Sequence, residues 1–199
     1  MDEIKSARDI AQQKIDSVGE VSQTDRLRWK YLPQGEKLAV KYLKEGGSLP
    51  AELAKFPPEA QPYVKKGVEY VLTSNIVLPA SDAAKENNRK AADGLMSIKK
   101  DKSAAAKYLN QLRQVLDHYT EQGARQREAT KNALKDQYQS RVKQAMDRQL
   151  GGAAELEGMK INVESMPQFQ DEWRRTAAQL DEQYLKLMEE FKKELSSID

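Results

Sequence analysis

The sequence contains no cysteine and only one histidine in 199 residues. Without cysteine the chain has no disulfide bonds, thiolate metal sites or cysteine nucleophiles. The single histidine, His118, cannot by itself supply the ligand cluster of a zinc site. We therefore expect no metal and no cofactor. Because no nucleophile or acid is placed beside His118 by any motif, we interpret it as a solvated or packed helix residue and expect no catalytic residue.

Long apolar runs are also missing, so no stretch approaches the roughly 20 residues of a membrane-spanning helix. The first residues lack a basic region followed by an apolar core, the pattern of a secretory signal. We therefore expect a cytoplasmic protein without membrane contact. No glycine-rich phosphate loop is present either, because Gly46-Gly47 and Gly151-Gly152 fit helix ends and neither is followed by Lys-Ser or Lys-Thr. No small-molecule substrate is evident.

What the chain does contain is charge. Charged residues make up 32% and apolar residues 39%, and the mean hydropathy is −0.82. This composition is typical of long solvated helices. The formal net charge is only +2, so no global field indicates a nucleic-acid partner. The sequence predicts an all-α protein.

Prolines and glycines divide the first hundred residues into short helices. Helical spacing predicts an amphipathic helix over residues 2–18, which Gly19 ends. Pro33 is predicted to end or kink the next helix, so that Glu36 to Glu45 forms a separate one. Asn75 to Pro79 is predicted to be an extended linker. The apolar positions of the first helix are Ile4, Ala7, Ala11, Ile15 and Val18.

Aromatic residues and prolines are concentrated in two stretches of this half, Trp29 to Pro33 and Phe56 to Tyr63. We interpret them as corners that fasten short helices to a core. A peptide-binding groove is the alternative.

Residues 102–150 are predicted to form one long helix, because this stretch contains no proline and is rich in residues that favour helices. At 1.5 Å per residue it would be roughly 70 Å long. Asp101 is predicted to cap its start. Its middle, Glu121 to Asn132, is nearly all polar, so we expect the weakest packing and the likeliest bend there, close to Gly123 and Arg127.

The last part of the chain carries an apolar stripe on a helix that Pro167 opens. Its steps of three and four residues repeat every eleven residues, a period that keeps the stripe on one face of a nearly straight helix. Such a stripe needs a partner. Its members are Met166, Phe169, Trp173, Ala177, Leu180, Tyr184, Met188, Phe191 and Leu195.

The long helix is the predicted partner, in an antiparallel coiled-coil-like hairpin turned at Gly151-Gly152. Residues 102–150 hold ten basic and five acidic residues, whereas residues 151–199 hold six and eleven, so the two arms have opposite net charge. Two registers are open. In the favoured one Trp173 lies near Val142 and the end of the last helix near Tyr119; in the other, Tyr184 to Leu195 meet the dense face Ala105 to Tyr119.

The predicted architecture is thus a short-helix subdomain, residues 1–101, followed by a long helical hairpin, residues 102–199. We expect a non-enzymatic scaffold, adaptor or assembly subunit that binds another protein or itself. Leu185 and Leu187 widen the stripe beyond one seam, which predicts a second covering helix and self-association. The expected interaction residues are Phe169, Trp173, Leu180, Tyr184, Leu185, Leu187, Met188 and Phe191.

Two other functions remain open. A basic surface from Lys85 to Lys102, interrupted by acidic residues, would suit a nucleic-acid-associated protein. An enzyme whose polar residues converge only in three dimensions is the third possibility.

The first thirty residues, from Met-Asp-Glu-Ile-Lys-Ser-Ala-Arg to Leu-Arg-Trp-Lys-Tyr, resemble a family of uncharacterised all-helical prokaryotic proteins. The resemblance covers about the first half of the chain. Since that family has no assigned activity, the resemblance implies a helical fold and gives no residue a role.

Overall fold

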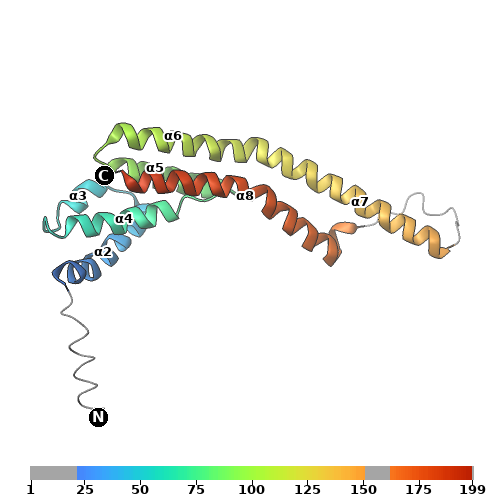
Figure 1. Ribbon diagram of the computed structural model, residues 1–199, viewed down its shortest axis with the longest axis horizontal. Coiled ribbons are helices and arrows are strands. Elements are labelled where there is room, and N and C mark those ends of the chain that lie inside the picture. Colours follow the sequence, from blue (N-terminus) through green and yellow to red (C-terminus); the bar gives the residue numbers. More distant parts are fainter. Residues whose placement is uncertain (1–21, 151–161, 199) are drawn as a thin grey trace, which may run out of the picture. The chain divides into compact units, whose positions relative to one another are not determined.

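A computed structural model describes residues 22–150 and 162–198 (Figure 1). Within these ranges all regular structure is helical and no strand occurs, which confirms the all-α prediction. The helix predicted over residues 2–18 and the turn predicted at Gly151-Gly152 lie outside the described residues.

The described chain forms two compact units. Residues 22–76 and 90–98 belong to the first unit, and residues 77–89, 99–150 and 162–198 to the second. Helix α5, Asp82–Ile98, contributes to both. The predicted division after residue 101 lies close to the break after Ile98, but residues 77–89 group with the second unit.

The first unit is built on α2, Gln23–Glu45, which packs mainly against α4, Gln61–Ser74. The separate helix expected from Glu36 was a wrong prediction, because α2 continues through Pro33. Proline removes one backbone donor, but the helix on both sides of it is held by packing on α4. The short α3, Leu49–Leu53, follows two positive-φ glycines, Gly46 and Gly47, which end α2 as predicted.

The crossing of α2 and α4 is unusually close. A Cβ atom at Gly35 would lie 2.0 Å from the Val64 carbonyl oxygen, and one at Gly67 would lie 2.2 Å from the Leu32 carbonyl oxygen. Backbone therefore rests on backbone at this point. The fully buried apolar residues of this unit include Ala39, Leu49, Ala60, Val64, Val68, Leu72 and Leu95.

The predicted linker is extended, without helix or strand over residues 76–79. Buried Asn88 holds it through both polar atoms: its Nδ2 donates to the Val77 carbonyl oxygen at 2.7 Å, and its Oδ1 accepts from the Val77 amide at 3.0 Å. This pair of bonds explains why residues 77–89 form one compact piece.

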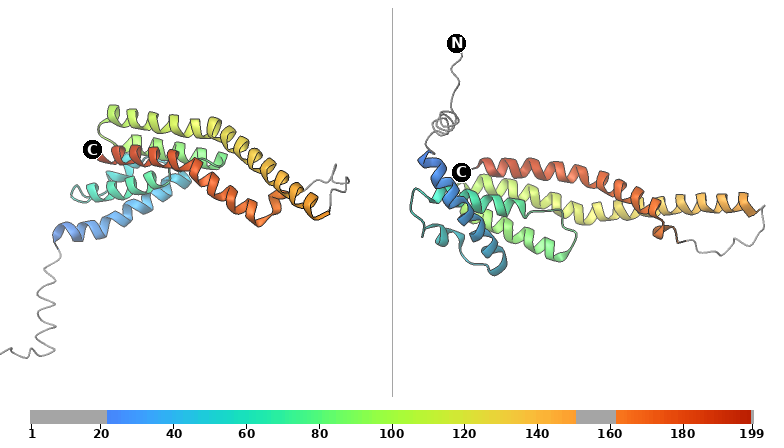
Figure 2. Two further views of the ribbon diagram at one scale, coloured as in Figure 1. Left: turned by 45° about the vertical axis from the view of Figure 1, so that its right-hand side comes forward. Right: turned by 90° about the horizontal axis from the view of Figure 1, so that it is seen from below.

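The second unit is built on the predicted long helix, and Figure 2 shows its path. It begins as α6, Lys102–His118, where the Asp101 carboxylate accepts a hydrogen bond from the Ala104 amide at 2.9 Å. It passes through a five-residue π-helix, η1, Tyr119–Gly123, and continues as α7, Ala124–Leu150. At the position of the predicted bend near Gly123 the helix has this wider turn. The weak packing expected there was a wrong prediction, because Gly123 is buried and the Tyr119 ring packs on Tyr184. The 3₁₀ turn η2, Val163–Ser165, leads into α8, Pro167–Ser197.

Helix α8 runs antiparallel beside the long helix (Figures 1 and 2). Tyr184 contacts His118 and Tyr119, and Phe169 contacts Tyr138. The favoured register was wrong, because Tyr184 rather than the end of α8 lies beside Tyr119. The reason lies in η2: Glu164 bonds to Lys131 and Lys135, so the chain returns along α7 before α8 begins. Trp173 and Val142 do pack against one common cluster.

Candidate interaction surface on α8

The structure places the predicted interaction residues of α8 in three environments. Phe169 and Met188 are buried. Four others are half-buried: Trp173, Leu180, Tyr184 and Phe191. Leu185 and Leu187 are 47% and 43% exposed. Most of the stripe is therefore already covered within the chain.

Phe169 anchors the first turns of α8. Its ring meets the Tyr138 ring edge-on at 5.4 Å between centroids, and both belong to one buried cluster with Leu134 and Val163. The Tyr138 hydroxyl donates a 2.6 Å hydrogen bond to the Glu172 carboxylate. This contact fixes α8 against α7 at one end.

The π-helical turn supplies the second contact. The Tyr119 and Tyr184 rings pack edge-on at 5.1 Å, and the Tyr184 hydroxyl lies 2.9 Å from His118 Nδ1. The Arg127 guanidinium sits 4.0 Å above the Tyr119 ring and donates to the Asp181 carboxylate at 3.0 Å. Because π-helical turns are frequent at functional sites, this cluster was a candidate for chemistry.

Its electrostatics favour a structural role. Burial, followed by the nearby Asp181 carboxylate, raises the pKa of the Tyr119 hydroxyl above its ordinary value, although Arg127 acts in the opposite direction. The phenol is therefore held neutral and is poorly suited to accept a proton at neutral pH. The described residues also contain no group of three or more His, Cys, Asp or Glu side chains that could hold a metal ion.

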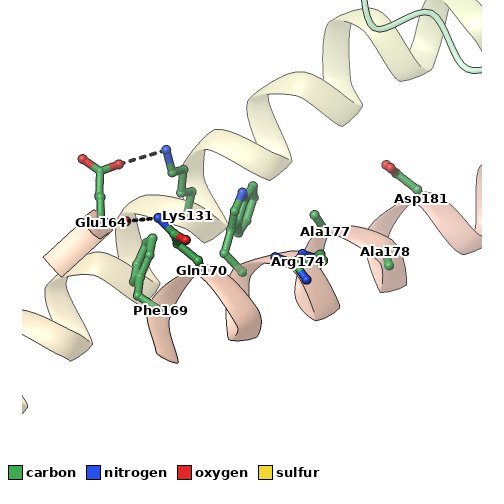
Figure 3. Close-up of a pocket in the computed structure, with 9 residues that line it drawn as sticks. Lys131, Glu164, Phe169, Gln170, Arg174, Ala177, Ala178 and Asp181 are labelled. Atoms are coloured by element: carbon green, nitrogen blue, oxygen red, sulfur yellow. Dashed lines mark hydrogen bonds and ion pairs between the residues drawn. The ribbon is translucent and has the colours of Figure 1, made fainter. Parts of the chain in front are cut away.

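Between the two contacts lies an open groove of about 660 Å³ (Figure 3). One wall comes from α7 and η2 and the other from α8. Two consecutive small side chains, Ala177 and Ala178, lie between Arg174 and Asp181 in the α8 wall. The lining residues are Lys131, Glu164, Phe169, Gln170, Trp173, Arg174, Ala177, Ala178 and Asp181.

The two acidic side chains that line the groove form ion pairs within the second unit. Glu164 accepts from Lys131 at 2.9 Å and from Lys135 at 3.2 Å, and Asp181 pairs with Arg127. The two lysines lower the pKa of the Glu164 carboxyl below its ordinary value. The groove thus holds paired charges.

Replacement of Glu164 by glutamine should lower the stability of the second unit at neutral pH. A carboxyl with a depressed folded-state pKa stabilises the fold above its unfolded-state pKa, and this contribution is lost as the pH falls through the folded-state value. We expect wild type and Glu164→Gln to differ in urea unfolding at pH 7, and the difference to shrink progressively as the pH falls below the unfolded-state pKa of about 4.3. The control, Glu128→Gln on exposed α7 surface, should show little difference at neutral pH. A difference for Glu164→Gln that is as large at pH 3 as at pH 7 would contradict this role.

The exposed leucines lie on opposite flanks of α8. Residues two positions apart on an α-helix are about 160° apart around the axis, with buried Met188 between Leu185 and Leu187 on the packed side. A single partner helix therefore cannot cover both. The predicted widening of the stripe takes the form of two separate apolar edges.

The basic surface expected from Lys85 to Lys102 is divided. Lys99 is 2% exposed and its Nζ donates to the Ile198 carbonyl oxygen at 2.6 Å, at the end of α8. Lys85 and Arg89 form ion pairs with Asp82 and Glu86. Lys99 therefore stabilises the C-terminal end of a helix, where a cation is favourable, rather than facing a ligand.

Sequence reasoning missed Asp181 and Glu164 as partners. The acidic partners of Arg127, Lys131 and Lys135 come from residues 162–198, in keeping with the opposite net charge of the two arms. The particular pairs depend on the register, which the charge totals do not specify.

Comparison with known proteins shows that the chain belongs to a family of unknown function, DUF6657, whose model matches residues 50–197. The expectation of an uncharacterised helical family is therefore confirmed, but the match excludes the first thirty residues that suggested it. No curated protein and no solved structure matches significantly. Among the described helices, none is both long and apolar enough to cross a membrane.

Proposed function

We propose that this chain is a non-enzymatic helical scaffold, adaptor or assembly subunit that binds another protein or a second copy of itself. The observation that carries the proposal is the exposure of Leu185 and Leu187 on both flanks of a helix whose central face is already packed. Single exposed leucines are common on soluble proteins. Leu185 and Leu187, however, border the buried stripe of α8, and each of them extends that stripe into an apolar edge on its own side of the helix.

In this proposal α8 and the long helix act as a coiled-coil-like hairpin in the cytoplasm. The packed stripe gives rigidity, and the exposed edges give the contact. Full burial of one leucine side chain contributes roughly 1.5–3 kcal/mol, so Leu185 and Leu187, which are 47% and 43% exposed, supply part of the free energy that association requires. The adjoining groove, with the half-buried Trp173 in its wall, offers a place for one apolar side chain of the partner.

The test is a capture experiment with three immobilised baits. Wild type, Leu185→Glu/Leu187→Glu and the exposed-site control Gln183→Glu are each exposed to purified untagged protein and to an extract of native cells. We expect wild type and Gln183→Glu to retain the same protein and the double variant to lose it. Equal retention by all three baits would show that the α8 edges are not the contact surface.

The nucleic-acid alternative can be tested on the same preparations. Since Lys99 is buried, a nucleic-acid surface there would depend on the remaining cations between Lys85 and Lys102. An electrophoretic shift at low salt that falls steeply with added salt would favour this alternative. Absence of a shift at low salt would remove it.

A further inference from the structure

Between Arg26 and Lys44, the side of α2 turned away from α4 carries only basic and apolar residues. Gly35 marks the side that faces α4, because its backbone abuts Val64. At about 100° per residue, eight exposed positions fall within an arc of roughly 120° centred opposite Gly35. We term these positions the outer face of α2. They are Arg26, Trp29, Lys30, Pro33, Lys37, Val40, Lys41 and Lys44.

The cations of the outer face repel one another, and few of them are balanced by an acidic neighbour. Like charges three or four positions apart destabilise a helix, whereas opposite charges at that spacing stabilise it. Arg26 and Lys30 form one such like-charge pair. Lys37 and Lys41 form another, and of the cations on this face only Lys41 has an acidic residue at that spacing, Glu45. None of the ion pairs formed among the described residues includes a cation of the outer face. A local cost of this kind is expected where a surface serves binding.

Apolar side chains line one edge of this basic face. Trp29 is 66% exposed and Val40 is 42% exposed, and exposed Pro33 lies between them in the sequence. The outer face has no Asn, Gln, Ser or Thr side chain that could read the edges of nucleic-acid bases. A partner that combines negative charge with an apolar layer therefore fits the face better than a nucleic acid does. Tryptophan is enriched at the boundary between membrane and water, where its apolar ring and its polar N–H are both accommodated.

We propose that the outer face of α2 binds the surface of a membrane that contains anionic phospholipids. The cations lie against the phosphate groups, within the short range over which a negative membrane surface attracts them. From Arg26 to Lys44 about 27 Å of helix lies along that surface. Trp29 enters the headgroup region beside the cations, and the lipid phosphates relieve the repulsion along the helix.

A helix that lies on a membrane needs no long apolar run. The expectation of no membrane contact was drawn from the lack of such runs, and the proposal departs from it. The outer face belongs to the first unit, so its binding is independent of the apolar edges of α8.

The first test is co-sedimentation of the full chain with vesicles of phosphatidylcholine, with and without phosphatidylglycerol. We expect binding only to the anionic vesicles, and weaker binding as salt is added. Because one cation at such a surface contributes about fivefold in affinity, Lys30→Gln/Lys37→Gln should bind roughly 25-fold more weakly. The control Lys107→Gln/Lys143→Gln removes two exposed cations from α6 and α7 and should bind like wild type. Equal affinities of the two double variants, or no binding of wild type to the anionic vesicles, would overturn the proposal.

The second test follows Trp29 emission in a Trp173→Phe background, which leaves Trp29 as the only tryptophan. We expect the anionic vesicles to shift the emission to shorter wavelength and to reduce quenching by acrylamide, and pure phosphatidylcholine vesicles to do neither. Emission that is unchanged by the anionic vesicles would refute the contact of Trp29 with lipid. A shift caused by a single-stranded oligonucleotide but not by the vesicles would also overturn the proposal, and would assign the outer face to nucleic acid.

Discussion

Gly67→Ala should destabilise the first unit by roughly 3 kcal/mol or more. In an ordinary helix interior the same change stabilises by about 1 kcal/mol, because alanine is the better helix former. Here the added Cβ would lie 2.2 Å from the Leu32 carbonyl oxygen. Because the obstacle is backbone, α2 and α4 must separate to relieve the overlap, and this separation disturbs the packing along both helices.

Two control variants make the expected result specific. At Gly94 a Cβ would lie 2.7 Å from Tyr42 Cε1 and 2.9 Å from Leu72 Cδ1, which are side-chain atoms that can shift, so Gly94→Ala should cost less. Lys66→Ala changes an exposed neighbour and should have little effect. Denaturant unfolding followed by circular dichroism gives the order. A Gly67→Ala protein as stable as wild type would refute the close crossing.

Phe169→Ala should cost about 3–5 kcal/mol in the second unit, the usual range for removal of a buried aromatic ring. The side chain is 2% exposed and packs on Tyr138 within the cluster that joins α8 to α7. Its loss leaves a cavity in that cluster. Gln168→Ala, exposed in the same turn, is the control and should change the unfolding free energy little.

Trp173→Ala tests how deeply a second aromatic residue of the same stripe is buried. The apolar stripe places Trp173 on the packed face of α8. If the side chain were fully buried there, Trp173→Ala would lower the free energy of unfolding by the same 3–5 kcal/mol. The structure makes it half-buried in the groove wall, so we expect a smaller loss of roughly 1–3 kcal/mol. A loss for Trp173→Ala equal to that for Phe169→Ala would mean that the groove is closed in solution.

Local signals predicted much of the fold. Asp101 at the start of α6, Gly46-Gly47 after α2 and Pro167 at the start of α8 act through backbone hydrogen bonds and φ angles of neighbouring residues, so the sequence shows them directly. The eleven-residue repeat likewise predicted the packed face of α8. Such features depend on a few adjacent residues.

Contacts between distant residues were not predictable in the same way. Pro33 does not divide α2, since the packing at Gly35 against α4 holds the helix on both sides. The register of α8 was missed because steps of three and four residues fit several alignments, and the return of η2 along α7 depends on Glu164. The π-helical turn changes the hydrogen-bond pattern within one helix, which apolar spacing does not record. As a result, the pairing of Asp181 with Arg127 and the position of the groove could not be predicted from the sequence.

Light scattering of the purified full chain tests the central claim most directly, namely that the apolar edges of α8 make this protein assemble. The chain has a mass of 22.6 kDa. We predict a mass that rises above this value with concentration for wild type and for Gln183→Glu, and that stays at the single-chain value for Leu185→Glu/Leu187→Glu. A wild-type mass equal to that of one chain at every concentration up to the solubility limit would contradict self-association through α8.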